Sequence, residues 1–335
     1  MLLASTALGQ GQMIGWGSNA YGQTTVAPAP ALKFTQVMAG SLHTIGLKMD
    51  GSVQCWGSNS VGQCDTPSGL GGVRQVSIGG YHSVALKGDG SVVAWGDNFY
   101  GQCNVPAAAA GVTRIASGDV HNAALRGDGQ VVCWGDNADG QSTPPTGLVG
   151  VADVMCGQYV TMTLHANHTL TVWGYAGSGQ CTVPVGLTDV AQAAGGNLHC
   201  VAVRANGTVV CWGDNADGQS TVPSGLSGVT QVSAGWSHTA ALKSDGTVVC
   251  WGAGTTNTGV SPNLGQSVVP SGLTGVRTVS AGYGHTVVLK SDGTVQAWGL
   301  NRTGQCNAPV SLLSITRIAA GGDTTAVIKS DGSLF

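Results

Sequence analysis

Histidine recurs at one position of a repeated Gly-x-x-His pattern, and it is the side chain best suited to metal binding or proton transfer near neutral pH. Val160 and Thr324 replace it in the fourth and eighth copies. Metal ligands must converge to within about 2 Å of one point, whereas a position found once per repeat lies on a circle. We therefore expect no metal site and a structural role, in which each histidine bonds to adjacent backbone. The six histidines are His43, His82, His121, His199, His238 and His285.

Acidic groups that could catalyse a reaction are scarce, because the chain contains no glutamate. Asp136 with Asp139, and Asp214 with Asp217, lie in single loops, and their spacing is more typical of a surface turn than of a catalytic pair. There is no Gly-x-Ser-x-Gly elbow, phosphate-binding loop or Cys-x-x-Cys zinc motif in the sequence. The sequence predicts neither a catalytic residue nor a cofactor.

Aromatic residues and aspartates at variable positions point to protein binding instead. Tyrosine and tryptophan dominate the energetics of protein interfaces, and positions that differ between copies are free to serve a partner. An acidic rim around aromatic anchors suits a protein partner with a basic patch. Packing of the aromatics beneath neighbouring loops, and capping of turns by Asp97, Asp136 and Asp214, are the structural alternatives. The candidate partner-binding residues are Tyr21, Tyr81, Phe99, Tyr100, Asp119, Asp139, Tyr159, Tyr175, Asp217, Trp236, Tyr283 and Arg302.

The dipeptide Trp-Gly occurs eight times and defines the unit that must position these residues. The gaps between its tryptophans are 40 residues, then 39 five times, then 47. A period this regular predicts a ring or stack of one small unit. Abundant glycine, valine and threonine favour short strands joined by tight turns over helices. The tryptophans are Trp16, Trp56, Trp95, Trp134, Trp173, Trp212, Trp251 and Trp298.

One unit contains four candidate strands. Apolar and polar residues alternate in VTQVSA, HTAALK and TVVCWG, which run in that order from Val229 to Gly252, and a weaker segment, STVP, begins at Ser220. Asp245-Gly246 is a hairpin signal that requires positive φ, and the fourth copy has Asn167-His168 in its place. Four antiparallel strands in each repeat predict an all-β fold, a β-propeller of four-stranded blades.

The two ends of the chain predict closure of the ring. The last copy stops at Phe335 before any Trp-Gly, and residues 13–17 supply the missing strand. This gives eight blades, with one shared between the N- and C-terminal strands. Leu334 and Phe335 duplicate Met13 and Ile14 in this alignment, so a seven-bladed ring and a fragment of a longer array remain alternatives. Residues 13–335 are expected to form a single propeller domain, and residues 1–12 resemble the remnant of a signal peptide, which favours a secreted or periplasmic protein.

Strand direction places the aromatic residues on one face. Successive connections of an antiparallel meander alternate between two faces, so the Trp-Gly-x-Asn loops and the Gly-x-x-His loops share one, which we call the top. The Asp-Gly hairpins lie on the other face, the bottom. The loop after Trp251, up to Gln266, is eight residues longer than its neighbours, and a functional loop and a tolerated insertion are both open.

The motifs Trp-Gly-x-Asn-x-x-Gly-Gln and Gly-x-x-His-[Thr/Ser]-x-x-Leu resemble the regulator of chromosome condensation repeat. The short period, with Thr-Val-Pro after Gly-Gln, is similar to the bacterial branch of that family, which includes a secreted propeller that inhibits β-lactamases. The resemblance covers nearly the whole chain from Met13 onward and implies a propeller. The relatives usually have seven blades, so eight is a departure. The eukaryotic exchange factor's long inserted hairpin and basic tail are missing, so its activity is not carried over.

Charge and hydropathy exclude two classes of partner. The net charge is −3, and no lysine- or arginine-rich run marks a nucleic-acid surface. No stretch of about 18 apolar residues exists that would span a membrane. We expect a monomer that binds another protein and acts as an enzyme inhibitor or scaffold. A carbohydrate-binding or carbohydrate-cleaving propeller and a structural segment of a larger surface protein are the alternatives.

Ten cysteines occupy mainly two repeated positions, where other copies have small residues. One position precedes the repeat tryptophan and the other follows Gly-Gln. Buried free thiols that fill these positions as small apolar groups are one interpretation. Disulfides from Cys103 to Cys133 and from Cys181 to Cys211 are the other.

Overall fold

The computed structural model describes residues 13–25, 33–309 and 312–330. The expected signal-peptide remnant, residues 1–12, and the duplicated Leu334 and Phe335 lie outside these described residues. Secondary structure in the described part is all β, with no helix that could cross a lipid bilayer.

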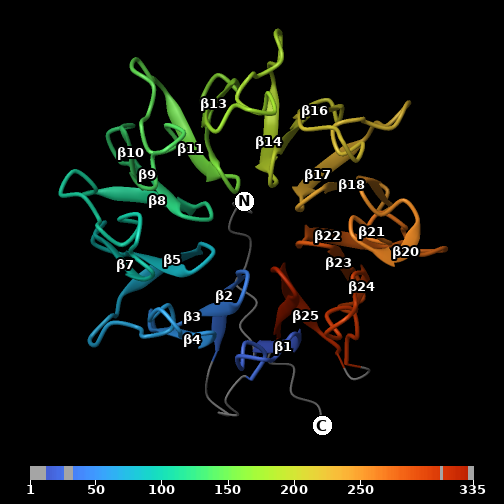
Figure 1. Ribbon diagram of the computed structural model, residues 1–335, viewed down its shortest axis with the longest axis horizontal. Helices are drawn as coiled ribbons and strands as arrows, with labels where there is room; N and C mark the ends of the chain where they lie inside the picture. Colours follow the sequence, from blue (N-terminus) through green and yellow to red (C-terminus); the bar gives the residue numbers. More distant parts are fainter. Residues whose placement is uncertain (1–12, 26–32, 310–311, 331–335) are drawn as a thin grey trace.

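Eight three-stranded antiparallel sheets are arranged in a ring around a central channel (Figure 1). Eight blades therefore replace the seven of the alternative count. In seven blades the strand nearest the channel comes first in the chain. In the last blade β25 is the inner strand, and β1, from the beginning of the chain, is the outer strand. The blades are β2 (Phe34–Ala39), β3 (His43–Lys48), β4 (Val53–Gly57); β5 (Val73–Ile78), β6 (His82–Lys87), β7 (Val92–Gly96); β8 (Val112–Ser117), β9 (His121–Arg126), β10 (Val131–Gly135); β11 (Val151–Cys156), β12 (Val160–His165), β13 (Leu170–Gly174); β14 (Val190–Gly195), β15 (His199–Arg204), β16 (Val209–Gly213); β17 (Val229–Ala234), β18 (His238–Lys243), β19 (Val248–Gly252); β22 (Val276–Ala281), β23 (His285–Lys290), β24 (Val295–Gly299); and β25 (Ile315–Ala320), β26 (Thr324–Lys329), β1 (Met13–Gly17).

The N- and C-terminal strands close the ring, as the sequence predicts. β1 pairs with β26 in an antiparallel register that sets Gly15 opposite Ala326. The last blade then meets the first, where Gly322 N donates to Gly40 O at 2.9 Å. Phe34 of the first blade packs in one apolar cluster with Ile328 of the last.

Among residues 13–25, 33–309 and 312–330, the expected fourth strand of the blades does not form, so the sheets have three strands. The segment after Gly-Gln lies beside the third strand, but its N–H groups already serve the preceding loop. Ser142 N donates to Asn137 Oδ1 at 3.0 Å and Thr143 N donates to Gly140 O at 2.9 Å. Proline follows at Pro144 and has no N–H to offer to a ladder.

The apolar core lies between blades rather than inside them. Most repeat tryptophans share an apolar cluster with residues of a neighbouring blade, as Trp134 does with Val84 and Leu86 of β6. The Trp134 indole Nε1 donates to Gln102 O at 3.0 Å. Shared positions of the repeat therefore hold neighbouring blades together, which leaves the loop tips free to vary.

Hydrogen bonds from side-chain amides to backbone groups also join the inner strands of neighbouring blades. The Gln75 amide donates from Nε2 to Ile115 O at 2.8 Å and accepts from Ile115 N at 3.1 Å. One glutamine side chain thus pairs with both the N–H and the C=O group of Ile115 on the next blade. At the same position in the next two blades Arg114 and Asp153 form an ion pair at 3.9 Å.

Eight cysteines are free thiols, as the first interpretation predicts, and the one disulfide is a pair that neither interpretation predicts. Cys55 and Cys64 form a disulfide that links β4 to the segment beside it. This repeat alone has cysteine at both positions, and the two positions face each other within one blade. Cys103, Cys133, Cys181 and Cys211 are free thiols, so the proposed pairs Cys103–Cys133 and Cys181–Cys211 are wrong. Their opposite positions carry Ala94, Ser142, Val172 and Ser220.

Candidate functional site

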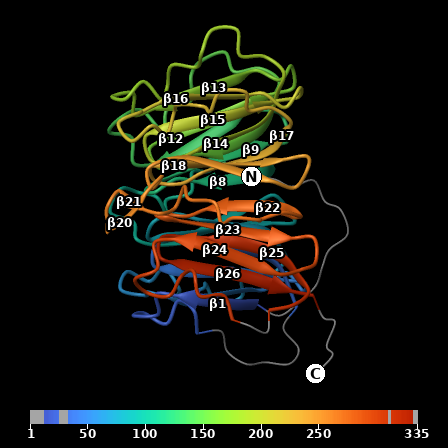
Figure 2. The same cartoon turned by 90° about the vertical axis from the view of Figure 1, so that its right-hand side faces the viewer.

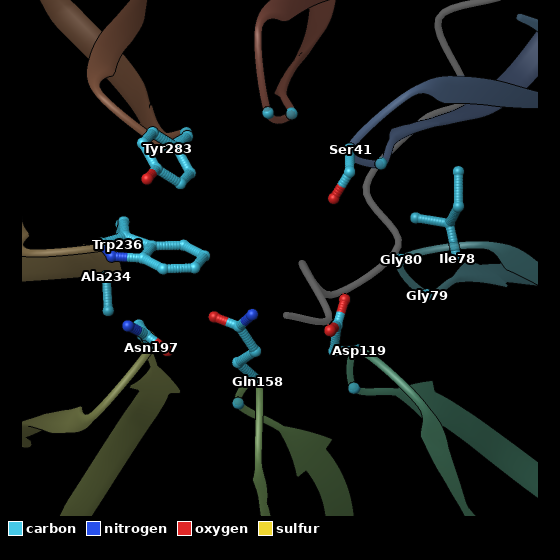
Figure 3. Close-up of a pocket in the computed structure, with 18 of the residues that line it drawn as sticks. Ser41, Ile78, Gly79, Gly80, Asp119, Gln158, Asn197, Ala234, Trp236 and Tyr283 are labelled. Carbon is cyan, nitrogen blue, oxygen red and sulfur yellow. The ribbon is translucent and has the colours of Figure 1, made fainter. Parts of the chain in front are cut away.

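The mouth of the central channel is a cavity of about 270 Å³ on the top face (Figure 3). Each blade contributes three consecutive residues to its wall: the last residue of the inner strand, the loop glycine and the first residue after it. The third residue in this set varies most between blades. Those eight residues are Ser41, Gly80, Asp119, Gln158, Asn197, Trp236, Tyr283 and Gly322.

The loop glycines are required because neighbouring blades meet there. A Cβ on Gly118 would lie 2.7 Å from Gly157 O of the next blade and would also collide with the His121 ring. Hydrogen bonds run from loop to loop, from Gly80 N to Asp119 O at 2.9 Å and from Gln158 N to Gly196 O at 3.1 Å. The mouth is therefore held by backbone contacts between blades, so the side chains at its rim start from preorganised positions.

Two aromatic rings occupy one side of the mouth. The ring centroids of Trp236 and Tyr283, on adjacent blades, are 4.4 Å apart with planes inclined by 40°. Their exposed fractions are 36% and 41%. Figure 3 shows the Trp236 indole extending into the opening. Large aromatic surfaces that stay this exposed beside a cavity are typical of binding anchors.

A single carboxylate, that of Asp119, points into the opening from another side (Figure 3). Burial raises the pKa of this carboxyl group above its usual value, and a hydrogen bond from Gln158 opposes the rise. Asn197, on the blade next to that of Trp236 (Figure 3), has an enclosed amide oxygen with no hydrogen-bond partner among the described residues. The mouth therefore has a carboxylate across the opening from an aromatic surface (Figure 3).

The repeated histidines lie directly beneath these loops and bind across the blades. His121 Nε2 lies 3.0 Å from Thr161 Oγ1 of the next blade, and Thr161 Oγ1 donates to Gln141 O at 2.9 Å. The hydroxyl hydrogen is thus used, so Nε2 must carry the proton and donate. The expectation of a bond to adjacent backbone is wrong in this respect, because each Nε2 instead meets a Ser, Thr or Asn side chain on the following blade.

Burial keeps these histidines neutral. It lowers the pKa of His121, His199 and His285 to about 4, and that of His238 to about 3. In the part of the chain that the structure describes, no group of three or more His, Cys, Asp or Glu side chains is placed to hold a metal ion. The histidines therefore serve to join blades and to support the mouth.

The candidate partner-binding residues divide into three groups. Asp119, Trp236 and Tyr283 line one cavity. Tyr159 and Tyr175 approach with ring centroids 6.4 Å apart, and the pair Phe99 and Tyr100 with centroids 4.9 Å apart. The remaining candidates do not line the mouth, although all lie in the loops of the top face; they are Tyr21, Tyr81, Asp139, Asp217 and Arg302.

Three aspartates of the top face act on their own loops, as the structural alternative predicts. The carboxylate Oδ2 atoms of Asp97, Asp136 and Asp214 accept from the Nε2 atoms of Gln102, Gln141 and Gln219 at 2.8, 2.7 and 2.6 Å. These carboxylates are partly engaged, so they contribute less to an acidic rim than the sequence suggests. Burial raises the pKa of the Asp323 carboxyl group above its usual value, and the positive charge of Arg302 opposes this rise.

The inserted loop forms a hairpin that packs against the loop that carries Tyr283. Strands β20 (Asn257–Val260) and β21 (Asn263–Leu264) extend from one edge of the ring (Figure 2). Leu264 is buried, and a Cβ on Gly284 would lie only 3.1 Å from Leu264 Cδ1. The insertion therefore packs against Gly284, the residue that follows Tyr283 in the chain, which favours a functional loop.

Ser41, Gln158 and Asn197 are lining residues that the sequence alone did not single out. They occupy the same position of the repeat as Trp236 and Tyr283. That shared position could have identified them as lining residues from the sequence. Polar residues at a variable loop position are inconspicuous, because surface loops are generally polar.

Comparison with known proteins identifies the repeat. Six segments, together just over half of the chain, match the regulator of chromosome condensation (RCC1) repeat; they are residues 34–63, 73–102, 112–141, 190–219, 229–257 and 276–305. No curated protein sequence matches. The fold is similar to Prp20p of Saccharomyces cerevisiae, with 18% identity and a TM-score of 0.63 over 97% of this chain and 93% of that chain.

Two further structures have the same fold. Human WBSCR16 has 21% identity and a TM-score of 0.62, with 96% of this chain and 99% of that chain covered. The ectodomain of the receptor kinase CR4 from Physcomitrella patens has 24% identity and a TM-score of 0.59, with 84% and 73% covered. From its repeated sequence motif and its ring of blades, the chain belongs to the RCC1 repeat family of β-propellers.

Proposed function

We propose that the protein is a binding scaffold that recognises another protein through the loops of its top face. The observation that carries this proposal is the exposure of aromatic side chains there. Phe99 is 83% exposed, and the Trp236–Tyr283 pair lies at the rim of a cavity. Exposed aromatics grouped on a rigid surface are typical of interface anchors.

The relatives supply a second line of support. The solved Prp20p structure is described together with its binding to Gsp1p and histones, and a further structure shows Kap60 bound to it. Propellers of one fold serve many functions, so these particular partners are not transferred to this chain. The acidic side chains Asp119, Asp139 and Asp217 make a partner with a basic patch the best match.

The proposed mode of action is occlusion by a preformed surface. A partner enzyme would be inhibited when its active-site opening is covered by the top face. We further propose that the protein acts as a monomer outside the cytoplasm. The Cys55–Cys64 disulfide supports that location, because disulfides persist in oxidising compartments.

A pull-down from secreted and periplasmic proteins tests the proposal, with a Trp236→Ala, Phe99→Ala double variant as the comparison. Capture by the native protein and loss by the variant are expected. The matched control is Lys243→Ala, on the bottom hairpin, which should capture as well as the native protein. A glycan array run in parallel decides the carbohydrate alternative. Binding of a defined glycan without any protein partner would contradict the proposal.

A further inference from the structure

The wall of the channel mouth has one charge and it is negative. Of the residues that line it, Asp119 alone carries a charge near neutral pH, and the others are mostly glycine, alanine and uncharged polar residues. A partly buried carboxylate is costly unless a cation or hydrogen-bond donors approach it. Gln158 supplies one donor, and the side of Asp119 that faces the opening is left for a ligand (Figure 3).

The opposite side of the mouth suits a cation as well. The face of a tryptophan attracts a cation strongly, and a tyrosine does so less strongly. The paired rings of Trp236 and Tyr283 point into the same opening as the Asp119 carboxylate (Figure 3). A planar cation could therefore lie against the rings and direct its hydrogen-bond donors to the far wall.

The polar groups between these two sides select a guanidinium over an ammonium. Asn197 and Gln158 stand on the wall between Trp236 and Asp119 (Figure 3). A guanidinium has five donors in one plane and stacks on aromatic rings, whereas a lysine ammonium is a compact, strongly hydrated charge.

The size of the cavity fits one side chain. Its volume of about 270 Å³ lies just below the range of about 300–1,000 Å³ that is usual for pockets of drug-sized ligands. We infer that the mouth of the central channel binds a single guanidinium group, presented by an arginine of the partner protein. The arginine source rests on the proposed function, whereas the guanidinium site does not.

Short capped peptides test this site without the partner. The probes are acetyl-Gly-Arg-Gly-amide, the same peptide with citrulline, the same peptide with lysine, and methylguanidinium. Titration is followed by the NMR signal of the Trp236 indole N–H, assigned by its loss in Trp236→Ala. We expect saturable binding of the arginine peptide, with the citrulline and lysine peptides weaker by about tenfold or more.

Variants locate the site on the protein. Asp119→Asn and Trp236→Ala should each weaken the arginine peptide by about tenfold, measured for the second variant by calorimetry. Asp128→Asn is the matched control, because Asp128 lies on a bottom hairpin, between β9 and β10, away from the mouth, and it should leave binding unchanged. A melting curve of each variant confirms that it is folded.

Each outcome has a defined meaning. Equal binding of the citrulline or lysine peptide, or no effect of Asp119→Asn, would overturn the guanidinium site. Methylguanidinium that binds as tightly as the arginine peptide would overturn the assignment to a protein arginine and indicate a free guanidino compound. If a captured partner binds normally to Asp119→Asn while no peptide binds, this inference fails and the proposed function stands. If the peptide binds as described and no partner exists, the reverse holds.

Discussion

His121 on β9 donates from Nε2 to Thr161 Oγ1 on β12, so that a histidine of one blade is bonded 3.0 Å from a hydroxyl of the next. The same kind of bond joins five other pairs of blades. In the remaining two blades Val160 and Thr324 occupy the histidine position. The ring therefore depends on a series of neutral imidazoles, and this dependence leads to the first two predictions.

Acid should destabilise the ring well before it protonates the aspartates. The unfolded histidines have an ordinary pKa near 6.5, whereas burial lowers the pKa of His121, His199 and His285 to about 4 in the folded protein. The unfolded state therefore binds more protons between these values, and the free energy of unfolding should be largest above pH 6.5 and fall steadily toward pH 4. Urea midpoints measured from pH 7.5 to pH 4.5 check this. A midpoint that is constant down to pH 5 would contradict it.

Thr161→Val should cost about 1–3 kcal/mol in the free energy of unfolding, because it leaves the buried His121 N–H without an acceptor. Trp173 Nε1 still donates to Gln141 O at 3.1 Å, so that carbonyl keeps a partner. The matched control is Thr324→Val. The Thr324 hydroxyl is buried with no hydrogen-bond partner among the described residues, so this change of the same shape should be neutral or stabilising. Denaturant unfolding of both variants measures the difference. An equal loss of unfolding free energy in the two variants would contradict the role of the hydrogen bond from His121 to Thr161.

Removal of residues 1–17 should strongly destabilise the protein. β1 contributes the outer strand of the last blade and buries Trp16, and loss of a buried tryptophan side chain costs about 3–5 kcal/mol. The melting temperature should fall by about 4 °C or more, and the unpaired edge of β26 should favour aggregation. Deletion of residues 1–12 alone is the control. A melting temperature within about 2 °C of the full chain after removal of residues 1–17 would show that β1 is not needed for closure.

A reducing agent should lower the melting temperature through one disulfide. Cys55 and Cys64 close a loop with a sequence separation of 9, and constraint of a loop of this size stabilises by up to about 3 kcal/mol in the chain-entropy model. Cys64→Ser should melt at the temperature of the reduced protein and should not respond further to reductant. A decrease that persists in Cys64→Ser would point to other disulfides.

Trp236→Ala should separate stability from binding. Its ring contacts Tyr283 at the rim but is not part of the buried core, so the free energy of unfolding should fall by only about 0.5–1 kcal/mol. Affinity for the protein partner should fall by about 2 kcal/mol or more if Trp236 is an anchor. Paired measurement of melting temperature and partner affinity checks this. A large loss of stability that accounts for the whole loss of binding would return Trp236 to a structural role.

The sequence by itself determined the blade. The regular Trp-Gly period, the alternation in segments such as Val229–Ala234 and the glycine turns are local patterns, and local patterns define strands, hairpins and the order of repeats. The count of eight and the closure of the ring through residues 13–17 followed from the same periodicity. The fourth strand was predicted wrongly, because the side chain of Asn137 and the carbonyl of Gly140 take the N–H groups that a ladder would need.

Only the tertiary structure decided what the loops form together. More than one hundred residues of chain separate Asp119 from Trp236. No sequence pattern relates these two residues to each other or to Tyr283. They share a cavity because ring closure brings one residue from every blade to the same opening. The histidine bonds and the Cys55–Cys64 disulfide were decided in the same way. Their partners lie on the next blade or on a segment that folds back beside β4, and such contacts depend on how strands pack rather than on the residue types that the chain presents locally.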